Sequence, residues 1–192
     1  MKQDILKDIL EHNEVTQQLL NNQQLIDTVS MLVDELVDMF KGDRKLLLCG
    51  NGGSAADAQH LAAEFSGRFR LNRKPLDAEA LHVNTSYITA VGNDYDFQVI
   101  YERALEAKGR KGDMLFAFST SGNSENILRA CKKAKEMGVK CVGFTGSQNC
   151  KMDELTDVLI KIPSSNTPRI QEATMLLGHI ICEKVEQILF AK

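Results

Sequence analysis

The sequence predicts one α/β domain: a doubly wound, mainly five-stranded parallel sheet with helices on both faces and an N-terminal helical arm. Short apolar runs alternate with segments of helical periodicity, which is typical of parallel strands joined by crossover helices. The 192 residues suit a single domain, 1–192, and leave little room for a second. The 43% hydrophobic content can build a core and excludes wholesale disorder.

Residues 1–42 are expected to form two helices used in packing and oligomerisation. In residues 4–22 a few apolar side chains stand among charges and amides. That pattern suits a face packed on a partner subunit, although an ordinary edge helix explains it equally well. Residues 25–40 carry a clear helical stripe, and Gly42 supplies its end.

Strands and helices are expected to alternate after Gly42. The predicted strands are Lys45–Cys49, Ala78–Val83, Met114–Phe118, Lys140–Phe144 and Asp157–Ile162. The predicted helices are 55–65, 85–91, one from the end of the Ser119–Ser124 loop to Met137, and 169–190. Gly92 is expected to end the short helix 85–91.

Composition and charge exclude several classes of function. The net charge of −3 argues against a nucleic-acid partner, which needs a basic surface. No apolar run approaches the roughly 20 residues of a membrane span, and the polar, amphipathic start is neither a signal nor a transit peptide. The five cysteines form no CxxC pair, so we expect reduced thiols and a cytoplasmic location.

The loop Ser119–Ser124 places four hydroxyl residues and a glycine between a predicted strand and a helix start. Unpaired N–H groups at a helix N-terminus attract anions, and hydroxyls add uncharged donors. The pattern therefore favours a phosphate site. The alternative is a helix cap provided by Ser121 or Asn123, for which one side chain would suffice.

A second loop, Gly50–Ala55, matches the looser dinucleotide motif G-x-G-x-x-A. That motif also needs a carboxylate at the end of the second strand to hold a ribose. Here the strand is expected to end at His82-Val83-Asn84, and Asp77 and Glu79 lie at its start. Close approach of the backbone to a smaller ligand explains the glycines as well.

His60 and Glu64 lie four residues apart on a predicted helix, a spacing that suits two ligands of one metal but also a surface ion pair. Asp57 could orient the His60 ring. Gln171 and His179 lie on the last helix, about 12 Å apart along its axis, so a shared metal requires both to lean toward it or to come from different subunits. His179 could also be an ordinary core histidine.

Four segments of this chain resemble the phosphoheptose isomerases of the sugar isomerase (SIS) domain family. These are GNGGSAADAQHLAAEFSGRF (50–69), AVGNDY (90–95), FSTSGNSENI (118–127) and RIQEATMLLGHIICE (169–183). The serine loop marks the wider SIS family. The narrower match rests on His60 with Glu64 and on Gln171 with His179.

The resemblance implies the SIS fold and the conversion of sedoheptulose 7-phosphate to D-glycero-D-manno-heptose 7-phosphate. This is the first step of ADP- or GDP-heptose precursor synthesis for lipopolysaccharide or capsule. The resemblance also implies a homotetramer whose active sites are shared between subunits. One zinc ion per subunit would be bound by His60, Glu64, Gln171 and His179. The implied substrate-binding residues are Asn51, Gly52, Gly53, Glu64, Arg68, Asn93, Asp94, Ser119, Thr120, Ser121, Ser124 and Gln171.

Isomerisation through an enediol needs one group to move a proton between two carbons and another to move one between two oxygens. We expect Glu64 to transfer the proton between the carbons and His179 to transfer the proton between the oxygens. Two departures from the family pattern leave this division less defined: Pro168 stands where some members have an aspartate, and Thr174 where many have a second histidine. The alternative function is a non-catalytic SIS protein that binds a replication initiator.

Overall fold

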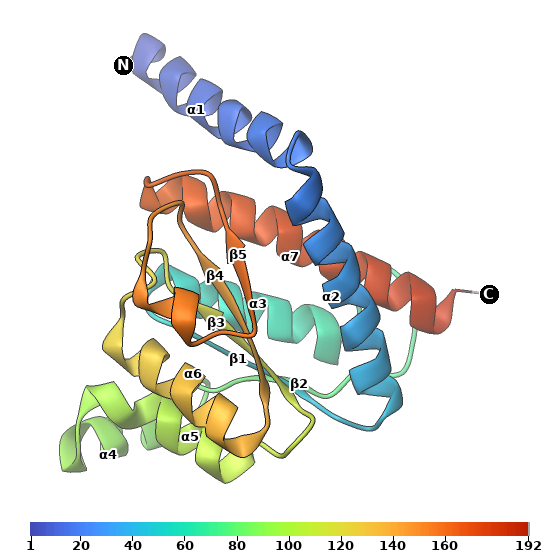
Figure 1. Ribbon diagram of the computed structural model, residues 1–192, viewed down its shortest axis with the longest axis vertical. Helices are drawn as coiled ribbons and strands as arrows, with labels where there is room; N and C mark the ends of the chain where they lie inside the picture. The colour runs from blue at the N-terminus through green and yellow to red at the C-terminus, as the bar shows by residue number, and fades with distance from the viewer. Residues whose placement is uncertain (192) are drawn as a thin grey trace.

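The computed structural model describes residues 1–191 and confirms the predicted fold class. Five parallel strands form one sheet in the order β2-β1-β3-β4-β5 (Figure 1). The strands are β1 (Leu46–Gly50), β2 (Ala78–Ala80), β3 (Met114–Phe118), β4 (Lys140–Thr145) and β5 (Val158–Lys161). The order reverses between β1 and β3, the position where open α/β sheets bind ligands.

Seven helices surround the sheet. They are α1 (Lys2–Leu20), α2 (Gln23–Lys41), α3 (Gly53–Ser66), α4 (Thr85–Asp94), α5 (Ile100–Lys108), α6 (Glu125–Met137) and α7 (Thr167–Phe190). Short 3-10 turns lie at Phe97–Val99 and Lys151–Glu154.

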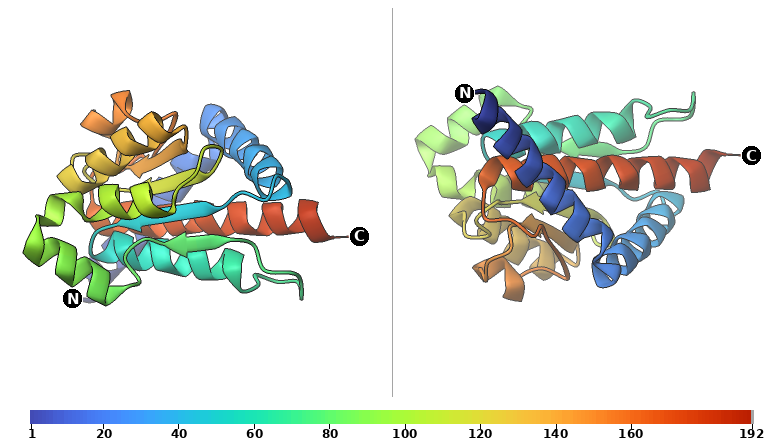
Figure 2. Two further views of the ribbon diagram at one scale, coloured as in Figure 1. Left: turned by 90° about the horizontal axis from the view of Figure 1, so that it is seen from below. Right: turned by 90° about the horizontal axis from the view of Figure 1, so that it is seen from above.

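Both faces of the sheet are covered, because successive side chains of a strand point to opposite sides. On β1, Leu46 and Leu48 join a core with α2, α3 and α7, whereas Leu47 and Cys49 join a core with α4, α5 and α6. Every β1 residue is buried, as expected of a central parallel strand. Figure 2 shows the sheet between its helices, with α3 and α7 side by side.

Three details differ from the sequence predictions. Strand β2 ends at Ala80 rather than Val83. Helix α4 continues through Gly92 to Asp94. Gly92 is not among the residues with positive φ, whereas Gly138, which does end α6, adopts the left-handed backbone with φ of 69°. The prediction omitted α5, whose helically spaced buried residues, such as Tyr101 and Leu105, could have revealed it.

Helix α1 projects from the body of the molecule (Figure 1). Only Val15 and Leu19 of this helix are buried. Five of its large apolar side chains are more than half exposed: Ile5, Leu6, Ile9, Leu10 and Leu20. Across residues 1–191, none of the helices is long and apolar enough to cross a membrane.

Candidate active site

Helices α3 and α7 form one side of the candidate site. They lie side by side and run in the same direction, because Gly53 at the start of α3 faces Gln171 and Leu61 farther along faces Gly178. Gly178 allows this close approach: a Cβ there would lie 2.7 Å from both terminal methyl groups of Leu61. The helices therefore pack closely immediately beside His179.

This packing brings His60 and Glu64 of α3 together with His179 of α7. The Nε2 atom of His60 lies 3.1 Å from Glu64 Oε1 and 3.2 Å from His179 Nε2. One ligand atom from each residue lies within 4.8 Å of the others. Residues 119 positions apart thus meet within one chain, and no second subunit is needed to join these three.

The donor set fits a divalent cation. A histidine ring nitrogen presents either one proton or one lone pair in the ring plane, so His60 Nε2 cannot bond well to both of its neighbours at once. A cation between the three would accept a lone pair from each. Two imidazole nitrogens and a carboxylate suit Zn²⁺, and the 3.2 Å nitrogen separation is close to the roughly 3.3 Å edge of a tetrahedron with bonds of about 2.0 Å.

Gln171 and Asp57 flank this group without bonding to it in the part of the chain that the structure describes. The Gln171 amide points to Ser54 Oγ at 3.5 Å, and its side chain fills the space beside Gly53 that any Cβ would occupy. No hydrogen bond joins Asp57 to His60. Burial raises the pKa of Asp57 to about 6, against the opposing effect of the His60 charge.

The hydroxyl loop Ser119–Ser124 follows β3. It is held by hydrogen bonds within the loop and by others to β4 and the segment after it, such as Gly146 N to Thr120 O at 3.1 Å. Ser119 is buried and its hydroxyl donates to Ser124 Oγ at 3.2 Å, while its carbonyl accepts from Gly122 N at 2.9 Å. Ser124 occupies the N-cap position of α6, but no side chain caps the helix. The helix-cap alternative for Ser121 or Asn123 is therefore wrong, and the first N–H groups of α6 stay available to an anion.

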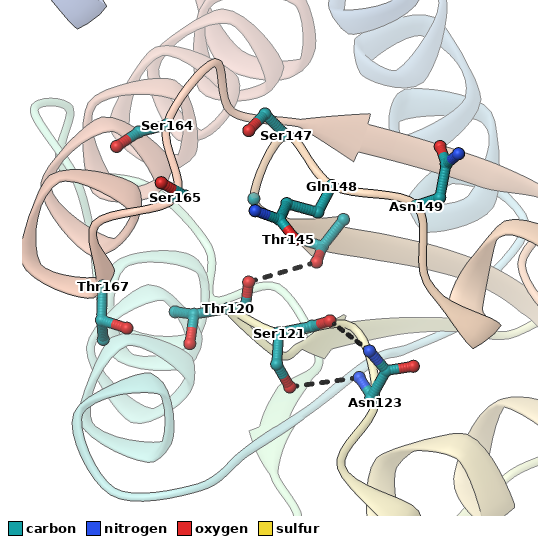
Figure 3. A pocket seen from close by; sticks show the side chains of 11 residues that line it. Thr120, Ser121, Asn123, Thr145, Ser147, Gln148, Asn149, Ser164, Ser165 and Thr167 are labelled. Atoms are coloured by element: carbon teal, nitrogen blue, oxygen red, sulfur yellow. Dashed lines mark hydrogen bonds between the residues drawn. The ribbon is translucent and has the colours of Figure 1, made fainter.

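A polar cavity of about 280 Å³ opens beside this loop (Figure 3). Of the predicted substrate residues it contains only Thr120 and Ser121. Its other walls, Thr145–Asn149 after β4 and Ser164, Ser165 and Thr167 before and at the start of α7, were missed by the sequence reasoning. The carboxyl ends of parallel strands share one edge, which could have indicated them.

An amide pair joins the loop after β1 to α6. Asn51 and Asn126 each donate to the other's carbonyl oxygen, at 2.8 and 2.9 Å. Asn126 is buried and was not singled out from the sequence. Gly52, next to Asn51, adopts a left-handed φ of 55°, which glycine accepts without strain.

Three predicted substrate residues make no hydrogen bond or ion pair with the other predicted site residues among residues 1–191. Arg68 is exposed after α3, and Asn93 and Asp94 are exposed at the end of α4, where Asn93 Nδ2 donates to Asp94 Oδ1 at 2.8 Å. Helix α4 lies at the same end of the molecule as the start of α7 (Figure 2). The two helices pack on opposite faces of the sheet.

Comparison with known proteins gives consistent results. Residues 11–146 match the model of the SIS domain. The chain is 47% identical over 192 residues to a phosphoheptose isomerase of Clostridium acetobutylicum, covering 100% of this chain and 98% of that one. A solved structure of phosphoheptose isomerase GmhA from Neisseria gonorrhoeae superposes with a TM-score of 0.90 at 36% identity, covering 97% and 98% of the two chains. One from Francisella tularensis gives 0.91 at 31%, covering 97% and 99%.

Proposed function

The chain belongs to the SIS domain family and, within it, to the phosphoheptose isomerases, and we propose that it converts sedoheptulose 7-phosphate to D-glycero-D-manno-heptose 7-phosphate. The observation that carries the proposal is the meeting of His60, Glu64 and His179 in a chain similar to such enzymes along its whole length. The non-catalytic alternative finds no support in these similarities.

Glu64 is the proposed base for the carbon proton. Its Oε1 faces His60, whereas its Oε2 makes none of the hydrogen bonds found among residues 1–191 and is free to accept a proton. It would take a proton from the carbon beside the ketose carbonyl and return it to the former carbonyl carbon, which leaves an aldose. The half-buried position of its side chain limits competition from water.

His179 is the proposed group for the oxygen protons. Because Nε2 is the nitrogen that faces His60 and the proposed cation, the proton would move through Nδ1. This nitrogen would give a proton to the carbonyl oxygen and take one from the neighbouring hydroxyl, so the imidazole ends each turnover unchanged. The Ser119–Ser124 loop would hold the phosphate with hydroxyls and helix N–H groups. Binding energy from this remote group places the reacting carbons at Glu64.

We further propose one Zn²⁺ per subunit, bound by His60, Glu64 and His179 with Gln171 as the fourth ligand. When bound, zinc would polarise the carbonyl and offset negative charge on the enediol oxygens. Gln171 lies two turns before His179, so it must reorient its side chain to take part.

We also propose a cytoplasmic homotetramer. The exposed apolar side chains of α1 support assembly, because a partner subunit would bury them. Within residues 1–191, Asn93 and Asp94 bond to each other and not to the other site residues, which supports active sites completed by a neighbouring subunit. Sedimentation of the whole chain and of an Ile5→Ser, Ile9→Ser variant tests this: the variant should form smaller species.

The function itself is tested by proton NMR with sedoheptulose 7-phosphate in heavy water, with and without a chelator. We expect aldose signals to grow and solvent deuterium to enter at the carbon that receives the returned proton, both suppressed by the chelator. Absence of any aldose with the zinc-loaded protein would contradict the proposed reaction. Full activity after complete metal removal would contradict only the zinc proposal.

A further inference from the structure

A buried ion pair lies two turns beyond His179 on α7. Glu186 and Arg73 each expose only 2% of their side chains, and Arg73 Nε donates to Glu186 Oε1 at 2.8 Å. The same carboxylate accepts the backbone N–H groups of Phe69, Arg70 and Leu71 at 3.0, 2.7 and 2.9 Å. One side chain of α7 thus holds residues 69–71 and Arg73 in the segment that follows α3.

Arg73 carries the connection back to α3. Its Nη2 donates to the carbonyl of Glu64 at 2.9 Å, and its Nη1 to the carbonyl of Phe65 at 2.8 Å. These carbonyls belong to the last turn of α3, where helix geometry leaves carbonyls without partners. The ion pair therefore connects the peptide unit of the proposed base to the helix that carries His179.

Phe69 extends the connection to the His179 side chain. Its ring centre lies 5.7 Å from that of His179, with 34° between the planes. Since Glu186 holds the Phe69 backbone, it restricts where the ring that packs on the imidazole can lie.

Stability alone is a poor reason for this arrangement. A buried ion pair contributes little compared with apolar side chains of the same size. Here nearly all the remaining hydrogen bonds of the pair go to the end of α3 or to the segment after it, the parts of the chain next to Glu64 and His179.

We propose that Glu186, Arg73 and Phe69 are positioning residues: they fix the Glu64 backbone and the His179 ring in the geometry that proton transfer requires. This inference rests on the proposed function, because it assigns proton transfer to Glu64 and His179. It adds residues that contact neither substrate nor metal in that scheme.

The test compares Phe69→Leu, Phe69→Tyr and Glu186→Gln with Leu105→Ala, which lies in the core on the other face of the sheet. We expect Phe69→Leu and Glu186→Gln to lower kcat about 10- to 100-fold with KM unchanged, and Phe69→Tyr to retain activity. Leu105→Ala should lose stability but keep kcat. Phe69→Leu leaves the ion pair intact, so it decides the question even if Glu186→Gln fails to fold.

A second readout needs neither metal nor substrate. The chain has four histidines, so the His179 ring signals can be assigned by NMR in the metal-free protein. Loss of the Phe69 ring current alone would shift these signals, so the readout is the set of nuclear Overhauser contacts from the His179 ring to its other neighbours. Phe69→Leu should change these contacts and Phe69→Tyr should not. Unchanged contacts of the His179 ring, or wild-type kcat in both Phe69→Leu and a folded Glu186→Gln, would overturn the proposal. A wild-type protein inactive on the heptulose phosphate would overturn the proposed function instead, while the NMR contacts would still decide whether Phe69 sets the ring.

Discussion

The hydroxyl loop after β3 and the paired helices α3 and α7 hold their functional groups by different means. The loop is a continuous segment of uncharged side chains, so its groups are already adjacent in sequence. Hydrogen bonds within the loop and to the chain around the end of β4 fix its backbone, such as Gly122 N to Ser119 O and Gly146 N to Thr120 O. The helices bring two imidazoles and a carboxylate together from distant positions, and the close packing at Gly178 and the Arg73–Glu186 ion pair hold the helices in place. Changes in the helices should therefore affect chemistry and stability, whereas changes in the loop should affect substrate affinity.

The largest expected effect is at the proposed base. Glu64→Gln keeps the size of the side chain but removes its ability to take a proton, so kcat should fall by at least about 10²- to 10⁴-fold. Sugar-phosphate binding, measured by calorimetry, should persist because the loop is intact. Glu106→Gln on α5 is the control and should keep wild-type kcat. Near-normal turnover by Glu64→Gln would refute the assignment.

The next effect concerns the helix contact. Gly178→Ala places a methyl group against Leu61 and should cost about 1–3 kcal/mol of unfolding free energy and weaken zinc binding. Gly92→Ala on α4 is the matched helical control, because a Cβ there has no neighbour within 4 Å. Gly92→Ala should instead raise the unfolding free energy by about 0.5–1 kcal/mol. Urea unfolding measures both, and equal effects would contradict the close packing.

A smaller effect is expected in the loop. Ser121→Ala removes one hydroxyl donor for the phosphate, a loss of about 1.5 kcal/mol, so KM should rise about tenfold with kcat unchanged. Steady-state kinetics separate the two constants. A fall in kcat at unchanged KM would show that the loop takes part in the chemical step.

The smallest expected effect is on the pH dependence of the unfolding free energy. Burial alone would raise the pKa of Glu186, but the N–H groups of Leu71, Arg70 and Phe69 together with Arg73 hold it below its usual value of 4.5. Its contribution to stability is therefore complete above pH 4.5 and is lost as the pH falls through the lower, folded-state pKa. Urea unfolding at decreasing pH should show this loss in the wild type, and Glu186→Gln should lack that part of the slope.

Much of the fold was predictable because strand runs and helical stripes are local signals. The boundaries that failed depended on context: β2 is a short edge strand, and Gly92 ends no helix because its backbone is not left-handed. The serine loop was also recognisable, since its groups are contiguous in sequence.

The meeting of His60 with His179 could not be obtained from spacing alone. Helical spacing relates His60 to Glu64 and Gln171 to His179, but nothing local specifies that α3 and α7 run parallel in contact. Asn126 and Glu186 were missed for the same reason, because their importance lies in partners far along the chain.

The Asn51–Asn126 amide pair joins the loop at the start of α3 to the helix that follows the serine loop. This pair therefore links the loop proposed to bind the phosphate to the start of the helix that carries the proposed base, and we expect it to keep their spacing fixed. A fixed spacing selects substrates by the length of the carbon chain between phosphate and carbonyl. A ketose phosphate with a shorter chain should bind through its phosphate but fail to bring its carbonyl within reach of Glu64. Such sugars should act as competitive inhibitors, so the enzyme should be selective for the length of the carbon backbone.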